Sequence, residues 1–156
     1  MSVLTEAMGQ EIRALFARYP RKRSVLLPAL HIVQRERGWI SPEAMAEVAA
    51  LLDIRPVEVM EVVSFYTLYN RAPVGRHHLQ VCRNIACALR GARRITRHLS
   101  GKLGVPVGGT TPDGRFTLSE VECLGSCGTA PMLQCNEDYH ENLTEERVDE
   151  ILSELP

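Results

Sequence analysis

Apolar residues recur at helical spacing through the first half of the chain. The first run ends at Pro20 and puts a set of apolar side chains on one helical face, namely Met8, Ile12, Leu15, Phe16 and Tyr19. A second run starts near Ser24 and stops at Gly38, a residue that readily takes the left-handed conformation of a helix C-cap. The spacing therefore predicts two amphipathic helices in this stretch.

Two further helices are indicated by their start signals. Ser41 can accept a hydrogen bond as an N-cap, and Pro42 suits the first position of a helix. Pro56 opens a fourth helix, which leads into an aromatic run at residues 64–69. Within this run we expect Phe65 to belong to the local core. The first part of the chain is therefore predicted to form four short helices.

The pattern changes from helical to mixed after a turn-rich segment at residues 70–76. A helix rich in arginine is predicted over residues 87–102, and Thr144 can cap a final helix. Four short strands are predicted at residues 79–82, 116–123 and 131–135 and near Tyr139. The apolar residues of the second strand cannot all share one alternating face, so we expect a bulge or kink there.

The order of these elements predicts an α+β fold in two domains. We expect a helical bundle at residues 1–72, followed by an α/β domain with a small mixed sheet at residues 76–156. A hydrophobic content of 45% in 156 residues is sufficient for packed cores.

Charge and hydropathy exclude several classes of partner. The 18 Lys and Arg residues nearly balance the 19 Asp and Glu residues, which argues against nucleic acid or an anionic membrane surface. The longest uncharged apolar stretch, at residues 24–33, is half the length of a membrane span and contains Pro28. The N-terminal residues lack the apolar run of a signal peptide. We therefore expect a cytoplasmic protein without nucleic-acid binding or direct membrane insertion.

Five cysteines in a chain without an export signal point to metal binding or redox chemistry. Cys82 and Cys87 lie where a predicted strand meets a helix, and Cys123 and Cys127 follow the next long strand. If these strands are neighbours, the two loops face each other and their four sulfurs can converge on one site. Cys135 stands alone in a strand-like segment and is interpreted as a core residue.

The spacing within each pair helps to choose the metal. Structural zinc sites usually have two residues between paired cysteines, whereas the pairs here have four and three, a wider spacing that suits a two-iron cluster. Gly125 and Gly128 leave room for backbone N–H groups to approach the sulfurs. A zinc-stabilised interaction module with four cysteine ligands remains the alternative. A thiol–disulfide enzyme is disfavoured, because neither pair is Cys-x-x-Cys.

A group of arginines lies around the first cysteine pair and along the helix after it: Arg83, Arg90, Arg93, Arg94 and Arg97. These side chains could compensate the negative charge of a thiolate-bound cluster. They could equally form the solvated face of an amphipathic helix, and we favour that interpretation for each of them individually.

The cysteine pairs lie in the segments VCRNIACALRGA and VECLGSCGTAPM. These segments resemble the two halves of the cluster motif in the thioredoxin-like [2Fe-2S] ferredoxin subunit of respiratory NADH dehydrogenase, or complex I. Upstream, LLPALHIVQRERGWIS and VMEVVSFYTLY resemble the helical extension of that family. The resemblance covers nearly the whole chain. It implies a thioredoxin-like domain from about residue 76 and one [2Fe-2S] cluster held by Cys82, Cys87, Cys123 and Cys127.

The same resemblance implies a function. The family works as an electron-transfer subunit of NADH-quinone oxidoreductase and is not catalytic alone. Its partner is the flavin-binding, NADH-oxidising subunit, which binds FMN and NADH within the peripheral arm of complex I. This arm places the subunit on the cytoplasmic side of the inner membrane. An equivalent subunit of an NAD-dependent formate dehydrogenase or an NAD-reducing hydrogenase is the alternative.

Overall fold

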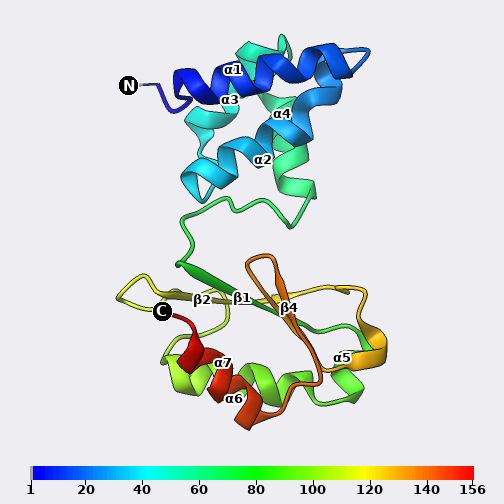
Figure 1. Cartoon of the computed structure of the whole chain (residues 1–156), viewed down its shortest axis with the longest axis vertical. Helices are drawn as coiled ribbons and strands as arrows, with labels where there is room; N and C mark the ends of the chain where they lie inside the picture. The colour runs from blue at the N-terminus through cyan, green and yellow to red at the C-terminus, as the bar shows by residue number, and fades with distance from the viewer. Residues whose placement is uncertain (1) are drawn as a thin grey trace. The chain divides into compact units, whose positions relative to one another are not determined.

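The computed structural model describes residues 2–156, and these form two compact units that divide between Pro73 and Val74. The first unit is helical, and the second contains a four-stranded sheet with helices (Figure 1). Each unit encloses its own cluster of buried hydrophobic side chains. The predicted α+β class is therefore confirmed. The assignment of residues 1–72 and 76–156 as separate domains is a proposal, which the two separate cores support.

The four helices predicted for the first unit are all present. As far as the described residues go, this unit contains four α-helices and two short 3-10 segments: α1 (Glu6–Ala14), η1 (Leu15–Arg18), η2 (Lys22–Val25), α2 (Leu26–Arg37), α3 (Pro42–Leu52) and α4 (Pro56–Phe65). The first predicted helix ends as a tighter 3-10 turn rather than as one continuous α-helix.

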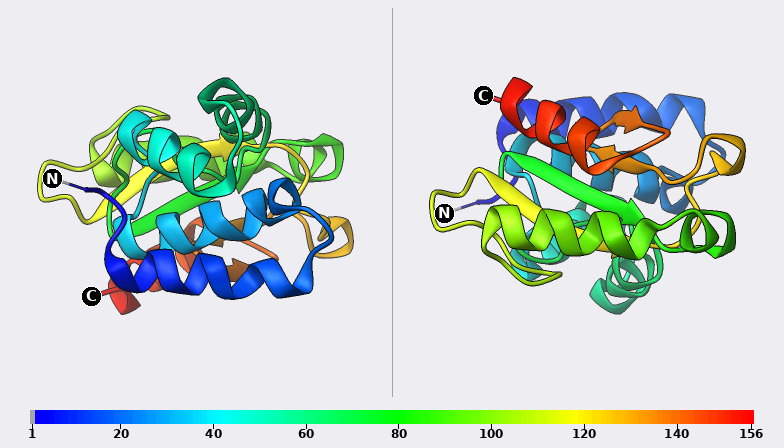
Figure 2. Two further views of the ribbon diagram at one scale, coloured as in Figure 1. Left: turned by 90° about the horizontal axis from the view of Figure 1, so that it is seen from above. Right: turned by 90° about the horizontal axis from the view of Figure 1, so that it is seen from below.

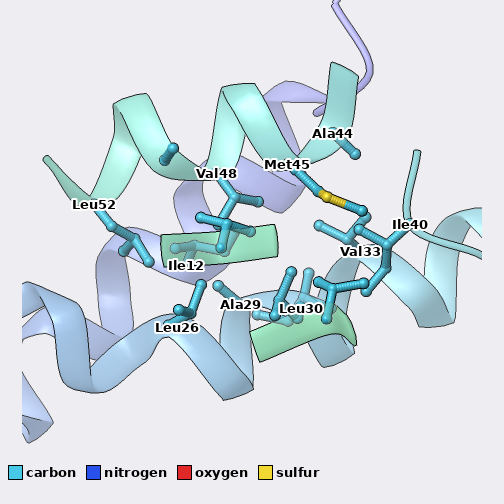
Figure 3. Close-up of a cluster of buried hydrophobic side chains, with 14 of the residues drawn as sticks. Ile12, Leu26, Ala29, Leu30, Val33, Ile40, Ala44, Met45, Val48 and Leu52 are labelled. Carbon is cyan, nitrogen blue, oxygen red and sulfur yellow. The ribbon is translucent and has the colours of Figure 1, made fainter. Parts of the chain in front are cut away.

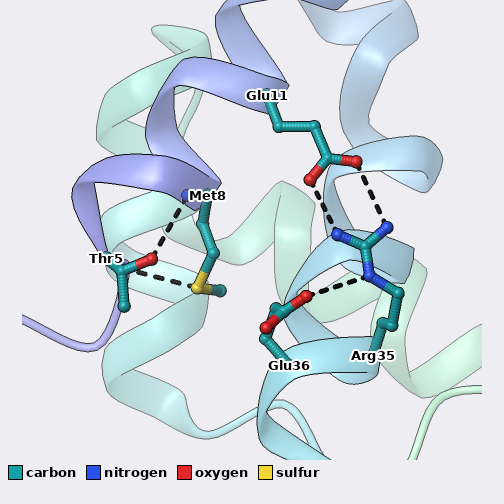
Figure 4. Close-up of polar contacts among 5 residues, drawn as sticks. All are labelled: Thr5, Met8, Glu11, Arg35 and Glu36. Atoms are coloured by element: carbon teal, nitrogen blue, oxygen red, sulfur yellow. Dashed lines mark hydrogen bonds and ion pairs between the residues drawn. The ribbon is translucent and has the colours of Figure 1, made fainter.

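The helix ends follow the local sequence. The Ser41 hydroxyl accepts a hydrogen bond from the backbone N–H of Ala44 at 3.1 Å, so it caps α3 as predicted. Gly38 ends α2 with a φ of 77°, in the left-handed region that favours glycine. At the start of α1, Thr5 accepts from the backbone N–H of Met8 at 3.2 Å (Figure 4).

The core of the helical unit is built from the inward faces of its helices. Ile12 of α1, Leu30 of α2 and Val48 of α3 are all fully buried and point toward one another (Figure 3). Glu11 and Arg35 join α1 to α2 on the outside through a bidentate ion pair, with Nη2 to Oε2 at 2.7 Å (Figure 4). Because both of these side chains are exposed, apolar burial supplies most of the stability of this unit.

Phe65 is not a core residue, so this expectation is wrong. Its side chain is 77% exposed, whereas Val63 in the same helix is buried. Two positions along an α-helix correspond to about 200° of rotation, so a helix that points Val63 inward points Phe65 outward. Tyr69 is the aromatic residue of this run that is buried, and its hydroxyl donates to the carbonyl oxygen of Leu27 at 3.1 Å.

The second unit contains a mixed sheet in the order β2-β1-β3-β4. β1 pairs with β2 in parallel, whereas β1 with β3 and β3 with β4 are antiparallel. Helices α6 and α7 lie side by side on one face of this sheet (Figures 1 and 2). The elements are β1 (His77–Cys82), α5 (Ile85–Leu89), α6 (Ala92–Leu103), β2 (Phe116–Val121), η3 (Cys127–Thr129), β3 (Leu133–Cys135), β4 (Asp138–His140) and α7 (Glu145–Glu154).

Two details of this unit differ from the sequence predictions. The single helix predicted over residues 87–102 is two helices, α5 and α6, because Gly91 between them has a φ of 96°. The second strand is predicted over residues 116–123 with a bulge or kink, whereas β2 is shorter and ends at Val121. Cys123 therefore lies in the following loop and does not have to share a face with the apolar residues of the strand.

The length and composition of the helices bear on membrane insertion. Across residues 2–156, no helix combines the length and the apolar character that a membrane crossing requires.

Truncating a buried side chain in the helical unit tests its core. We expect Leu30→Ala to lower the free energy of unfolding of this unit by about 3 kcal/mol, because Leu30 is fully buried. Leu68→Ala is the matched control, with a loss below about 1 kcal/mol because Leu68 is 44% exposed. Urea denaturation monitored by the fluorescence of Trp39, the one tryptophan of the sequence, measures both. Equal losses would contradict the assigned core.

Candidate metal centre

The two cysteine loops leave the same edge of the sheet. Cys82 is the last residue of β1, and Cys123 lies two residues beyond the end of β2. Because β1 and β2 run in parallel with Cys82 opposite Val121, the loops that follow them begin side by side. The Arg83 N–H extends this pairing by donating to the Val121 carbonyl at 3.0 Å. The predicted adjacency of these strand ends is confirmed.

The first cysteine pair is buried. Cys82 and Cys87 are each 3% exposed. Asn84 starts the short helix that carries Cys87, because its side-chain oxygen accepts from the N–H of Ile85 at 2.8 Å. Burial and then the neighbouring Cys82 thiol raise the pKa of the Cys87 thiol to about 11, while a backbone hydrogen bond with Met132 acts in the opposite direction.

The second cysteine pair is exposed. The Sγ atoms of Cys123 and Cys127 lie 4.0 Å apart, and the pKa of Cys127 is raised, chiefly by the Cys123 thiol. The Gly125 N–H donates to Cys123 Sγ at 3.4 Å, as the sequence suggested for this glycine. Gly125 has a φ of 84°, a conformation that a side chain would strain. Within residues 2–156, no corresponding bond joins the Gly128 N–H to a sulfur.

Each pair also has a small effect on the other. Cys127 adds to the raised pKa of Cys87, and Cys82 adds to that of Cys127. In the part of the chain that the structure describes, there is no group of three or more Cys, His, Asp or Glu side chains close enough together to hold a single metal ion.

The chemistry of the donor set fits a [2Fe-2S] cluster. Such a cluster uses four thiolates, with two on each iron. The loops offer two thiol pairs at one edge of the sheet, and a backbone N–H is already directed at one of the sulfurs. Metal binding would require the thiols to lose their protons, and the raised pKa values of Cys87 and Cys127 oppose that loss.

Cys135 lies apart from this group. It is 3% exposed in β3, where it pairs with Leu79 near the beginning of β1. Burial raises the pKa of its thiol, which keeps it protonated. This environment agrees with the interpretation of Cys135 as a core residue.

The arginines near the site are exposed, as expected for a solvated helix face. Arg83 forms an ion pair with Glu122 at 2.5 Å, and Arg94 forms one with Glu145 at 3.4 Å. Water screens both pairs, so their contribution to stability is small.

Sequence reasoning missed the residues that hold the second cysteine loop in place. The Tyr139 hydroxyl donates to the Leu124 carbonyl at 2.8 Å, and Glu141 accepts hydrogen bonds from Ser126 and Thr129. These contacts come from β4 and the residue after it, so they exist only once the β3–β4 hairpin has formed. The one signal in the sequence is that Ser126 and Thr129, next to Cys127, are polar. Their distance in sequence from Glu141 does not identify it as their partner.

A family model described as thioredoxin-like [2Fe-2S] ferredoxin matches residues 12–156. The chain belongs to this family. Members that are similar to it include an NADH-quinone oxidoreductase subunit of Rhizobium meliloti, 48% identical over 93% of this chain and 86% of the relative. A second NADH-quinone oxidoreductase subunit, from Thermus thermophilus, is 46% identical over 90% of this chain and 79% of the relative.

A solved structure shows the same fold. An NAD+-reducing [NiFe]-hydrogenase aligns with 83% of this chain at a TM-score of 0.72 and 24% sequence identity. The aligned part makes up 22% of that hydrogenase chain. At this level of identity the match shows a shared fold alone.

Alkylation of the metal-free chain tests the arrangement of thiols in this ferredoxin. We expect N-ethylmaleimide to modify Cys123 and Cys127 first, because these two thiols are exposed and the other three are buried. Peptide mass spectrometry over a time course identifies the modified positions. In urea all five cysteines should react at similar rates, which serves as the control. Fast modification of Cys82 or Cys87 in the folded chain would contradict the structure.

Proposed function

We propose that this chain is the electron-transfer subunit of an NADH-quinone oxidoreductase, and that Cys82, Cys87, Cys123 and Cys127 hold its [2Fe-2S] cluster. One observation carries the proposal. Two cysteine pairs leave adjacent parallel strands at one edge of the sheet, in a member of the thioredoxin-like [2Fe-2S] ferredoxin family. The names of the two relatives, both subunits of NADH-quinone oxidoreductase, support the host complex.

When bound, the cluster supplies one-electron redox chemistry. The residues of the chain determine how an electron reaches it. Cys82 and Cys87 lie in the core of the sheet unit and keep water away from their side of the site. Cys123 and Cys127 are exposed, so a redox partner can approach from their side.

We assign NADH oxidation to a separate flavin-binding subunit that binds FMN and NADH. A hydride carries two electrons, whereas a [2Fe-2S] cluster accepts one at a time. A flavin must therefore take up the hydride and release its electrons singly. This partner would lie in the peripheral arm of the complex, on the cytoplasmic side of the inner membrane.

The first test measures iron, acid-labile sulfide and zinc in anaerobically purified protein. We expect about two iron and two sulfide per chain and little zinc, as a [2Fe-2S] site requires. Cys123→Ser should lose or severely perturb the cluster, because it removes a ligand. Cys135→Ser is the matched control and should keep the cluster, because Cys135 lies in the core beside Leu79. Equal loss in both variants would contradict the assigned ligands, and stoichiometric zinc without sulfide would indicate a zinc module.

The second test concerns the division of labour between subunits. We expect the purified chain to show no NADH oxidation with an added electron acceptor, because it contributes no flavin. Activity should appear only when a flavin-binding subunit is added. Spectrophotometry at the NADH absorption band measures this directly, and turnover by the chain alone would refute the assignment.

A further inference from the structure

A carboxylate from outside the cysteine motif holds the loop that carries Cys123 and Cys127. Glu141 follows β4, and its Oε1 atom accepts a hydrogen bond from Thr129 Oγ1 at 2.6 Å and another from the Ser126 hydroxyl. Ser126 directly precedes Cys127, and Thr129 lies two residues after it. One side chain thereby anchors the chain on both sides of this cysteine.

The chemistry of the three groups fixes the direction of these hydrogen bonds. An ionised carboxylate only accepts, and each hydroxyl has a single proton to donate. Thr129 Oγ1 lies 2.6 Å from Glu141 Oε1 and 3.2 Å from the Ser126 carbonyl oxygen, so its proton is directed at the carboxylate. With both hydroxyls donating to Glu141, neither has a proton left for the 2.7 Å contact between Ser126 Oγ and Thr129 Oγ1. The carboxylate therefore holds the two hydroxyls together. Without the carboxylate, the Ser126 and Thr129 hydroxyls could bond only to each other or to nearby backbone, and no side chain would join the loop to the residue after β4.

The backbone next to Glu141 is attached to the same segment. The N–H of Asn142 donates to the Thr129 carbonyl at 2.7 Å, and the N–H of Leu143 donates to the Pro131 carbonyl at 2.9 Å. The main chain is thus already in position, so only the side chain of Glu141 has to be ordered.

The negative charge of Glu141 is not neutralised by a basic side chain. Among residues 2–156, no Lys, Arg or His forms an ion pair with it. Net charge and hydrogen bonding near an iron–sulfur site set its reduction potential, and a nearby negative charge opposes the addition of an electron. Glu141 is exposed, so water weakens this effect without abolishing it.

We propose that Glu141 is a positioning residue of the electron-transfer site. It orders the loop around Cys127 through two hydroxyl groups, and its charge lowers the reduction potential of the bound cluster. This inference rests on the proposed function, since it requires Cys123 and Cys127 to hold the cluster.

Glu141→Gln in the full, cluster-loaded chain tests the effect of charge. Gln keeps the length and an acceptor oxygen but removes the negative charge. We expect a more positive midpoint potential in a redox titration monitored by electron paramagnetic resonance, with iron and sulfide content unchanged.

Glu137→Gln is the matched control for this variant. Glu137 is also exposed, but it lies in the β3–β4 turn, where Asn136 bonds to His78 near the start of β1, far from Cys82 at its end. The control should keep the wild-type potential. Equal shifts in the two variants, or no shift in Glu141→Gln, would overturn the role of the charge.

Glu141→Ala tests the positioning. It removes the acceptor as well as the charge, so we expect faster loss of the cluster to a chelator and a changed resonance line shape compared with Glu141→Gln. A wild-type rate and line shape would overturn the positioning role. If the Ala variant does not fold by circular dichroism, Thr129→Val, which removes one of the two hydroxyls that donate to Glu141, replaces it in the same two measurements. A wild-type chain that takes up no cluster would instead contradict the proposed function.

Discussion

The parallel pairing of β1 with β2 is the constraint on which the candidate site depends. In this register Cys82 lies opposite Val121, so the segment with Cys87 and the segment with Cys123 start at the same edge of the sheet. A shift of one residue would turn every side chain of one strand to the other face of the sheet. The buried residues of β1 and β2 prevent such a shift, because Leu79 and Leu118 would then leave the core.

Much of this arrangement could be predicted from the sequence, because the signals are local. Ser41 and Gly38 mark helix ends through the conformations that these residues favour, and both act as predicted. The two cysteine pairs stand where apolar runs give way to turn residues, which indicates strand ends. That four thiols form the cluster ligands remains a prediction from this pattern and from the family.

What the sequence could not predict depends on tertiary structure. The exposure of Phe65 follows from the rotation of α4 about its axis, which is set by the packing of Val59 and Val63 against other helices. The break at Gly91 separates two helices within one continuous helical pattern, and a glycine inside such a pattern does not by itself show whether the helix ends there. The contact of Glu141 with the cysteine loop joins segments whose distance in sequence carries no periodic signal.

The separation of the two hydrophobic cores has a thermodynamic consequence. A ligand that binds only the folded form stabilises the part of the molecule whose unfolding releases it. All five cysteines lie in the sheet unit, so a group bound there raises the melting temperature of residues 74–156. Loaded and empty chains therefore differ in the temperature at which the sheet unit unfolds.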